Sequence, residues 1–183
     1  MIVEGEDSWM FQIPGTQLVQ HQAELCGCEW LPVATQGEPE KEVDDLKAAL
    51  SKLEIDGIVS GALRSDYQKT RLERMSEELG IKSFTPLWHQ SSKSHMSNLI
   101  ANGFKVMITG VSTEGLDSEW LGRVLNEESL QDLTRIASRY RFHVDGEGGE
   151  YETLVVAGPH MIGELEIDYV KHWDGVRGHL SFQ

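Results

Sequence analysis

Strand-like apolar runs alternate with amphipathic helical runs along most of this 183-residue chain. The clearest strands are "DGIVSGAL" (56–63) and "FKVMITGVS" (104–112), and the clearest helices are "EPEKEVDDLKAALSKLE" (38–54), "SDYQKTRLERMSEELG" (65–80) and "NEESLQDLTRIASRYR" (126–141). Strands that are separated by helices favour βαβ crossovers and a parallel sheet with helices on both faces. Both strand runs lack polar alternation, which is typical of strands that are buried from two sides. The sequence therefore predicts an α/β fold with a mostly parallel, doubly wound sheet.

The remaining segments fit the same plan except at the C-terminus. Helices are expected over 15–27 and 92–103, short extended segments over 29–35 and 83–88, and a further strand over 152–158. Residues 162–182 instead alternate in polarity around Asp174-Gly175, which predicts a C-terminal β-hairpin with a D-G turn. The sequence contains no linker long enough to separate two domains, so we expect residues 1–183 to form a single domain.

Acidic residues outnumber basic residues by 30 to 16, which gives a net charge of −14. This charge argues against direct nucleic-acid binding and against binding to an anionic membrane. The sequence has no apolar run of about 18 residues and no basic-then-apolar signal, so we expect a cytoplasmic protein. Cys26 and Cys28 form only a C-x-C pair, and the histidines lack metal-ligand spacing, so no transition-metal site is predicted.

Three polar or glycine-containing segments follow or approach the predicted strands, over 60–68, 110–122 and 145–152. In open parallel sheets, ligands bind beyond the carboxyl ends of the strands, so these segments are candidates for one pocket. The first segment is either an ordinary capped strand-to-helix turn or an anion site, and its candidate residues are Ser60, Gly61, Arg64, Ser65 and Gln68. In the second segment, Trp120 either anchors a long loop or lines the pocket.

The third segment, "DGEGGEYET" (145–153), places four carboxylates among three glycines. Like charges at this spacing repel each other, and glycine is entropically costly to fix, so packing alone does not favour such a sequence. One interpretation is a flexible, solvated turn that leads into a strand. The other is a pocket that is shaped by the backbone and needs carboxylates for its ligand.

The block "GEGGEYETLVVAGP" (146–159), with 56–88 and "EGLDSEWLGR" (114–123), resembles the diphthine–ammonia ligases, also called diphthamide synthetases. The opening "DSWMFQIP" (7–14) is similar to a segment that follows the second strand in that family. The resemblance covers nearly the whole chain and implies the adenine nucleotide α-hydrolase-like fold of ATP pyrophosphatases. It implies ATP-dependent amidation of diphthine, a modified histidine on translation elongation factor 2, with ammonium as nitrogen donor. ATP and Mg²⁺ would be the cofactors, and AMP and pyrophosphate would be released.

The resemblance assigns the 60–68 segment to the nucleotide and leaves three roles open for the acids of the third segment. Glu147, Glu150 or Glu152 could face the trimethylammonium group of diphthine, take a proton from the attacking ammonium, or bind Mg²⁺. Tyr151 could contact the trimethylammonium group through a cation–π interaction. Alternation along an extended segment would place Glu150 and Glu152 on one side and Tyr151 on the other. The other residues assigned to substrate binding are Gly146, Gly148, Gly149, Thr153 and Trp120.

Members of that family begin with a strand and an S-G-G-K-D-S-like loop that holds the ATP phosphates, and this sequence contains no such stretch. We therefore expect an N-terminally truncated sheet, with the first strand, phosphate loop and first helix encoded upstream or by a partner chain. The sheet edge beside 56–63 should then be open and apolar. The alternative function is a non-catalytic binding module, or half of a split protein, that engages elongation factor 2 or a nucleotide.

Overall fold

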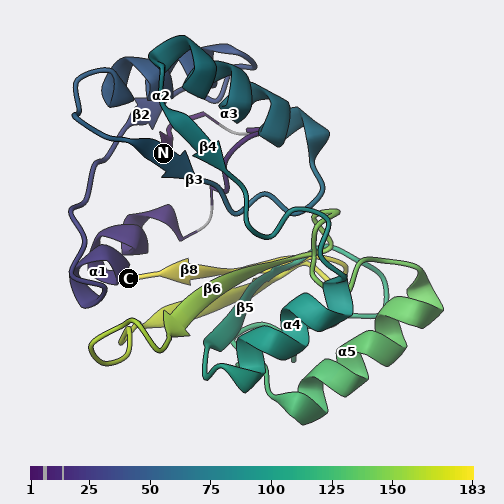
Figure 1. Cartoon of the computed structure of the whole chain (residues 1–183). Coiled ribbons are helices and arrows are strands. Elements are labelled where there is room, and N and C mark those ends of the chain that lie inside the picture. The colour runs from purple at the N-terminus through teal and green to yellow at the C-terminus, as the bar shows by residue number, and fades with distance from the viewer. Residues whose placement is uncertain (6–7, 14) are drawn as a thin grey trace. The chain divides into compact units, whose positions relative to one another are not determined.

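The computed structural model describes residues 1–5, 8–13 and 15–183, and its contacts group into two compact units (Figure 1). Unit 1 comprises Met1–Thr16 and Leu31–Gln90, and unit 2 comprises Gln17–Trp30 and Ser91–Gln183. The sequence predicted a single domain. A single domain would require the two units to pack as one body, so the single domain stays a prediction. Within the described residues, no helix is long and apolar enough to cross a membrane.

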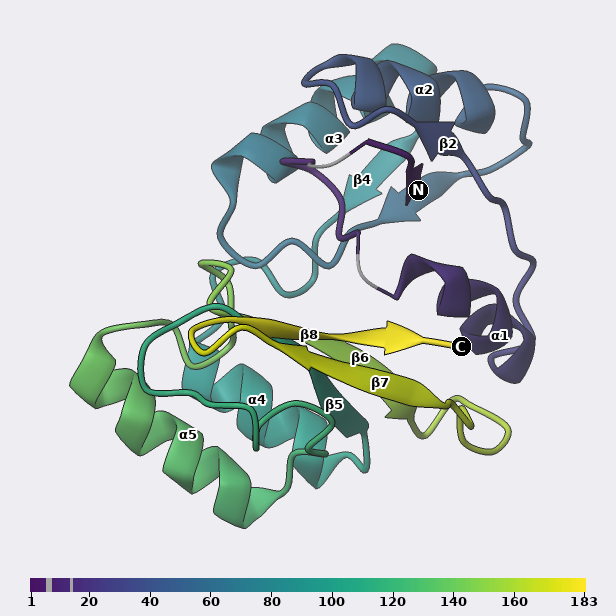
Figure 2. The same ribbon diagram turned by 180° about the vertical axis from the view of Figure 1, so that it is seen from behind.

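Unit 1 contains two small parallel sheets and two helices (Figure 2). The strand β1 (Ile2–Val3) pairs with β2 (Ala34–Thr35), and β3 (Gly57–Val59) pairs with β4 (Lys82–Phe84). The helices are α2 (Lys41–Leu50) and α3 (Asp66–Leu79). The parallel pairing of β3 with β4 across α3 is the βαβ crossover that the sequence predicted.

Helix α3 begins and ends where the sequence indicated, whereas α2 is shorter at both ends than the predicted 38–54. Ser65 is the N-cap of α3, where its hydroxyl accepts a hydrogen bond from the backbone N–H of Gln68 at 3.3 Å. Gly80 ends the helix in the left-handed conformation, with φ of 69°. The apolar stripe of α2 packs against Met75 of α3 in a small core. The residues of the stripe in this core are Val43, Leu46 and Leu50.

The β3–β4 sheet has an exposed apolar face. Val59 and Phe84 are paired across the two strands and keep 74% and 61% of their surface exposed. In the described residues, β3 has no hydrogen-bonded neighbour other than β4. An open, apolar edge beside 56–63 was expected from the sequence, and these exposures agree with that expectation.

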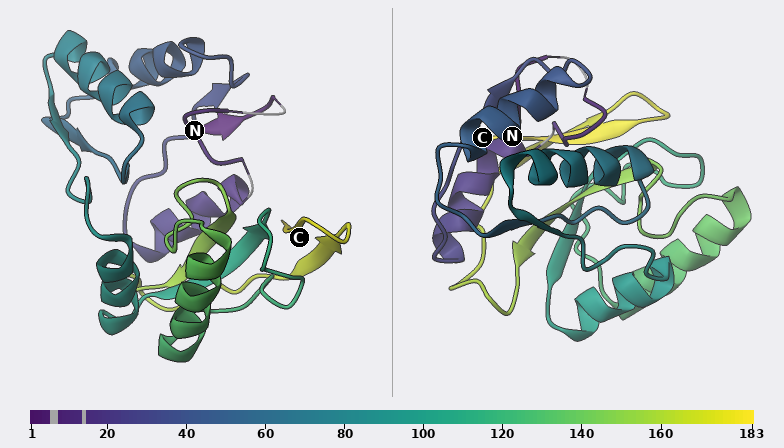
Figure 3. Two further views of the ribbon diagram at one scale, coloured as in Figure 1. Left: turned by 90° about the vertical axis from the view of Figure 1, so that its right-hand side faces the viewer. Right: turned by 45° about the horizontal axis from the view of Figure 1, so that its top comes forward.

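Unit 2 is built on a four-stranded sheet in the order β6-β5-β8-β7. Its strands are β5 (Lys105–Val111), β6 (Tyr151–Ala157), β7 (Tyr169–Trp173) and β8 (Gly178–Phe182). The helices α4 (Ser92–Ala101) and α5 (Glu127–Tyr140) lie side by side on one face of the sheet (Figure 3). The short 3-10 turn η1 (Thr16–Leu18) leads into α1 (Val19–Leu25), which lies on the other face.

The prediction of a mostly parallel sheet is wrong for unit 2, because all of its strand pairs are antiparallel. After β5 the chain runs back along that strand, where the N–H of Gly122 donates to the carbonyl of Ile108 and the N–H of Leu125 to that of Val106. The chain has therefore returned to the start of β5 before α5 begins. The helix then carries it to the other end, so β6 starts opposite Val111 and runs antiparallel to β5.

The predicted C-terminal hairpin is confirmed, with β7 and β8 paired from Tyr169–Phe182 to Trp173–Gly178. Its turn depends on Asp174, whose carboxylate accepts hydrogen bonds from the backbone N–H groups of Arg177 at 2.7 Å and Val176 at 2.8 Å. These bonds lower the pKa of the Asp174 carboxyl. Gly175 holds φ of 101°, a conformation that suits glycine.

The main hydrophobic core lies in unit 2, between the sheet and its helices. Helix α5 starts with a capping box between Asn126 and Ser129 and turns Leu133 and Ala137 inward, as its spacing predicted. Leu133 is fully buried, as are Ile108 and Leu121. Burial from both sides explains why the sequence of β5 is continuously apolar.

We expect Leu133→Ala to lower the free energy of unfolding by about 2–5 kcal/mol, because it opens a cavity in this core. The exposed Ser138 lies on the same helix, and Ser138→Ala should change stability by no more than about 0.5 kcal/mol. Urea unfolding followed by circular dichroism measures both changes. A Leu133→Ala protein as stable as the Ser138→Ala protein would contradict this view of the core.

Candidate functional site

The first candidate segment begins where β3 ends, at the carboxyl edge of the parallel β3–β4 sheet, as predicted. The backbone N–H of Ser60 continues the ladder by donating to the carbonyl of Phe84 at 2.9 Å, and its hydroxyl accepts from the N–H of Ala62 at 3.2 Å. Gly61 is exposed, and nothing lies within 4 Å of the position that a Cβ atom would take. This edge of unit 1 is therefore open at the turn after β3.

Three polar residues of this segment hold the surrounding turns together. Ser65 caps α3, and the amide of Gln68 donates to the carbonyl of Met10 at 3.2 Å. The guanidinium of Arg64 donates to the carbonyl of Gln90 at 2.5 Å. These contacts order the edge of the sheet, and each of the three groups already has a partner within unit 1.

The segment "DSWMFQIP" also lies in unit 1, although Asp7 and Pro14 fall outside the described residues. The hydroxyl of Ser8 donates to the carboxylate of Glu42 at 2.5 Å and accepts from the N–H of Phe11 at 2.9 Å. Glu42 is fully buried at the start of α2. The buried carboxylate of Glu42 thus fixes the turn over residues 8–11, which contacts the start of α3 through Gln68.

The acidic segment forms an ordered turn around the carboxylate of Glu150. One carboxylate oxygen accepts from the backbone N–H of His143 at 2.9 Å, and the other accepts from that of Gly148 at 2.8 Å. Ser112, at the end of β5, donates its N–H to the carbonyl of Glu150 at 2.9 Å and its hydroxyl to that of Gly149. Glu150 therefore holds the turn closed, which the solvated-turn interpretation did not include.

The glycines of this turn are explained by backbone geometry. Gly146 and Gly149 have φ of 72° and 78°, in the left-handed region that favours glycine. At Gly148, a Cβ atom would lie 2.6 Å from a carboxylate oxygen of Glu150. A larger residue at that position would displace the carboxylate that closes the turn.

Tyr151 supports the turn from inside the protein. Its side chain is only 3% exposed, and its hydroxyl donates to the carbonyl of Val144 at 2.5 Å. Burial raises the pKa of the phenol, and the nearby carboxylates of Asp145 and Glu150 raise it further. A ring this buried offers no face to a trimethylammonium group, so the structure does not favour the predicted cation–π contact.

Glu152 has different surroundings from Glu150. Its Oε2 atom is buried and has no hydrogen-bond partner in the described part of the chain. The side chain lies over Gly110 of the neighbouring strand, where a Cβ atom would come within 3.3 Å of it. Burial raises the pKa of this carboxyl, because the charged form loses hydration without gaining a donor. Glu152 is thus a half-buried carboxylate that can accept a proton or face a cation.

The remaining predicted residues have different surroundings. Trp120 is 6% exposed within the core of unit 2, with the guanidinium carbon of Arg123 4.5 Å from its ring centroid. The sequence left two roles open for Trp120, and the structure favours the first: it anchors the loop after β5 and does not line a pocket. Thr153 is half-buried opposite Ile108, and Glu147 is half-buried on the turn.

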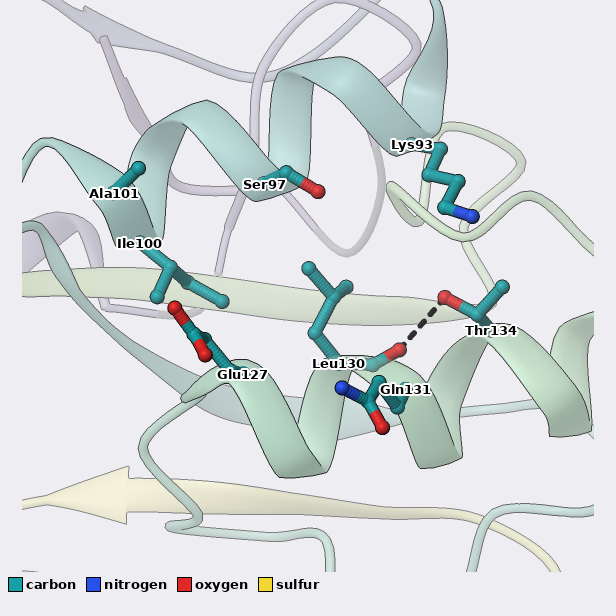
Figure 4. Close-up of a pocket in the computed structure, with 8 residues that line it drawn as sticks. All are labelled: Lys93, Ser97, Ile100, Ala101, Glu127, Leu130, Gln131 and Thr134. Atoms are coloured by element: carbon teal, nitrogen blue, oxygen red, sulfur yellow. Dashed lines mark hydrogen bonds between the residues drawn. The ribbon is translucent and has the colours of Figure 1, made fainter.

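A hollow of about 580 Å³ lies between α4 and α5 in unit 2 (Figure 4). Figure 4 shows Lys93 near one end, Glu127 and Ile100 next to each other near the other end, and Leu130 between the two ends. The other lining residues are Ser97, Ala101, Gln131 and Thr134. None of the eight was predicted as a site residue.

The sequence missed the two groups that shape the acidic turn, Ser112 and the backbone N–H of His143. A polar residue directly after a buried strand was the only signal for Ser112, and nothing in the sequence marks a main-chain donor. Among the described residues, no three His, Cys, Asp or Glu side chains group as metal ligands. Because both oxygens of Glu150 accept backbone hydrogen bonds, this acid does not suit Mg²⁺, and we derive no step through that ion.

The two candidate segments belong to different units. The shared pocket expected from the sequence therefore stays a prediction.

The environment of Glu152 predicts a pH effect on stability. Its carboxyl pKa is raised in the folded chain, so the folded state binds more protons than the unfolded state above pH 4.5, and its stability falls as the pH rises through this window. Glu152→Gln removes the effect. Thermal scans measure the melting temperatures of the variant and the native chain. We expect the variant to gain on the native chain as the pH rises from 4 to 7. A difference in melting temperature that does not change with pH would contradict the buried environment of Glu152.

Comparison with known proteins gives the same family for both units. Residues 1–83 match the family model of the diphthamide synthase N-terminal domain, and residues 91–183 match that of the diphthamide synthase C-terminal domain. The two matches meet close to the boundary between unit 1 and the main part of unit 2.

Curated relatives named diphthine–ammonia ligase align with most of the chain. The relative from Mus musculus is 32% identical over 179 residues, which cover 88% of this chain and 66% of the relative. The relative from Danio rerio is 31% identical over 183 residues, covering 88% of this chain and 69% of the relative. The relative from Homo sapiens is 30% identical over 179 residues, which cover 88% of this chain and 66% of the relative. The chain spans about two thirds of the length of these relatives, and it belongs to the diphthamide synthase family.

Proposed function

We propose that the chain takes part in the ATP-dependent amidation of diphthine on translation elongation factor 2, which gives diphthamide, AMP and pyrophosphate. The observation that carries the proposal is the match of residues 1–83 and 91–183, in order, to the N- and C-terminal domains of the diphthamide synthase family. The proposal names elongation factor 2 and ammonium as the partners and the cytoplasm as the site of action. It requires no direct contact with nucleic acid or membrane.

The reaction joins ammonia to a carboxylate, which is a poor acceptor until one of its oxygens becomes part of a good leaving group. ATP supplies that group as AMP. When the C–N bond forms, the nitrogen must lose a proton, and a carboxylate with a raised pKa is a suitable acceptor. Burial raises the pKa of the Glu152 carboxyl, and its Oε2 atom has no donor among the described residues, so we assign it this role.

The other residues of the turn act through position. Glu150 and Ser112 hold the turn closed through backbone hydrogen bonds, and Tyr151 fixes it from below through Val144. Main chain at Gly148 and Gly149 is exposed and can approach the substrate. Glu147 is half-buried on the turn, and it is the acid that we assign to the trimethylammonium group of diphthine.

Nucleotide binding is assigned to the carboxyl edge of the β3–β4 sheet in unit 1. Gly61 leaves space there, Arg64 supplies a positive charge, and the capped start of α3 supplies backbone N–H groups. The phosphate grip of the family would come from an S-G-G-K-D-S-like loop, which this sequence does not contain. We therefore expect ATP binding by this chain alone to be weak.

A second candidate function is a non-catalytic module, or half of a split protein, that engages elongation factor 2 or a nucleotide. The observation in its favour is the exposed apolar pair Val59 and Phe84 on the β3–β4 sheet. An exposed apolar sheet face is a binding surface or an aggregation hazard. A partner strand that pairs with the edge of β3 opposite β4 would extend the sheet in trans.

The deciding experiment is amidation of diphthine-bearing elongation factor 2 with ATP and ammonium. It compares this chain with a version extended at its N-terminus by a strand and an S-G-G-K-D-S-like loop. We expect diphthamide and AMP with the extended version, and little product with this chain. Binding of the elongation factor without product from either version would favour the non-catalytic module.

The two acids of the turn should respond differently to loss of charge in the active version. Glu152→Gln should lower kcat by about 10²–10⁴-fold, because it removes the proton acceptor, while the free energy of unfolding at pH 7 does not fall. Glu150→Gln replaces one acceptor oxygen by an amide donor that faces a backbone N–H, so it should destabilise the chain by about 1–3 kcal/mol.

Kinetics and urea unfolding of both variants test this assignment, with Glu114→Gln as a control in an exposed acid of the loop after β5. An unchanged kcat for Glu152→Gln would assign the proton transfer to another group. An unchanged stability for Glu150→Gln would show that its two hydrogen bonds do not hold the turn.

A further inference from the structure

Two rings after β4 lie face to face at the open edge of unit 1. The indole of Trp88 and the imidazole of His89 have centroids 4.6 Å apart and planes 14° apart. Trp88 is half-buried and His89 is exposed, so the indole backs an imidazole that solvent can reach. Neither residue was singled out from the sequence, because one tryptophan and one histidine in a turn carry no pattern.

The backbone holds this stack in an uncommon conformation. His89 has φ of 56°, in the left-handed region that residues other than glycine rarely adopt. Its N–H donates to the carbonyl of Leu63 at 2.9 Å, which ties the turn after β4 to the turn after β3. The stack is therefore fixed at the carboxyl ends of two neighbouring parallel strands, where open α/β sheets bind their ligands.

Two cations lie next to the rings. Arg64 donates to the carbonyl of Gln90, the residue after His89, and the ammonium of Lys69 is 5.3 Å from the centroid of the Trp88 ring. Lys69 also pairs with Glu73, which is on the same helix. A flat ring surface beside positive charges suits a ligand that is both aromatic and anionic, and it disfavours a quaternary ammonium group.

We infer that Trp88 and His89 form a stacking platform for the adenine base of a nucleotide, with Arg64 and Lys69 near its phosphate. The inference rests on the proposed function, because it places the base of the nucleotide that the amidation consumes. It adds a part of the site that the glycine and serine residues after β3 cannot supply, since they offer hydrogen bonds to phosphate but no surface for a base. The imidazole is the contacting ring, and the indole holds it in place.

AMP and ribose 5-phosphate, titrated into the full chain and followed by nuclear magnetic resonance, test the platform. The two ligands share the sugar and the phosphate, and only AMP carries the base. His89→Asn removes the ring and keeps a residue type that tolerates the left-handed conformation, so the fold should survive. Trp88→Leu removes the backing ring, and His21→Asn is the control, because it makes the same exchange at an exposed histidine of α1.

We expect His89→Asn to raise the Kd for AMP by about fivefold to a hundredfold, with Trp88→Leu acting in the same direction. The Kd for ribose 5-phosphate should not change in either variant, and His21→Asn should change neither Kd. An unchanged Kd for AMP in His89→Asn would overturn the platform, as would an equal loss for both ligands or no AMP binding by the native chain. AMP binding that depends on His89 with no amidation by the extended version would instead keep the platform and reject the proposed reaction.

Discussion

The pairing of β5 on both of its edges is the constraint on which unit 2 depends. The strand lies between β6 and β8, and its residues 106–108 also bond to the returning segment 122–125. Six of its seven residues are buried, so the strand has little freedom to shift. It places Gly110 beneath Glu152 and Ser112 beside the acidic turn, so hydrogen bonds from the end of β5 add to those that Glu150 makes within the turn.

Hydrogen-bond donors separate acids that look equivalent in the sequence. Glu150 receives two backbone N–H donors, and these bonds make it part of the structure of the turn. Glu152 is two residues away and has a buried oxygen without a donor, which favours its protonated form. Two neighbouring carboxylates thus have different chemistry because one is next to main-chain N–H groups and the other is over a glycine in a sheet.

Unit 1 has a smaller core and a more open surface than unit 2. Its fully buried apolar residues cluster around Met75, while Val59 and Phe84 remain exposed on the β3–β4 sheet. Hydrogen bonds, rather than apolar burial, order its carboxyl edge: Gln68 reaches Met10, Arg64 reaches Gln90, and His89 reaches Leu63. An edge that is ordered by polar contacts can be well defined and still accessible, which suits a ligand site.

The sequence by itself determined the positions of the helices, the caps of α3, the C-terminal hairpin and the family, because local periodicity, capping residues and a long motif are properties of neighbouring residues. Only the tertiary structure decided the direction of β6, since the return of the chain along β5 through Gly122 and Leu125 is a long-range pairing with no local signal. The site divided in the same way. The motif at 145–153 was recognisable as unusual, but the burial of Tyr151, the closing role of Glu150 and the unpartnered oxygen of Glu152 depend on which backbone donors and side chains reach them from β5 and the turn before β6.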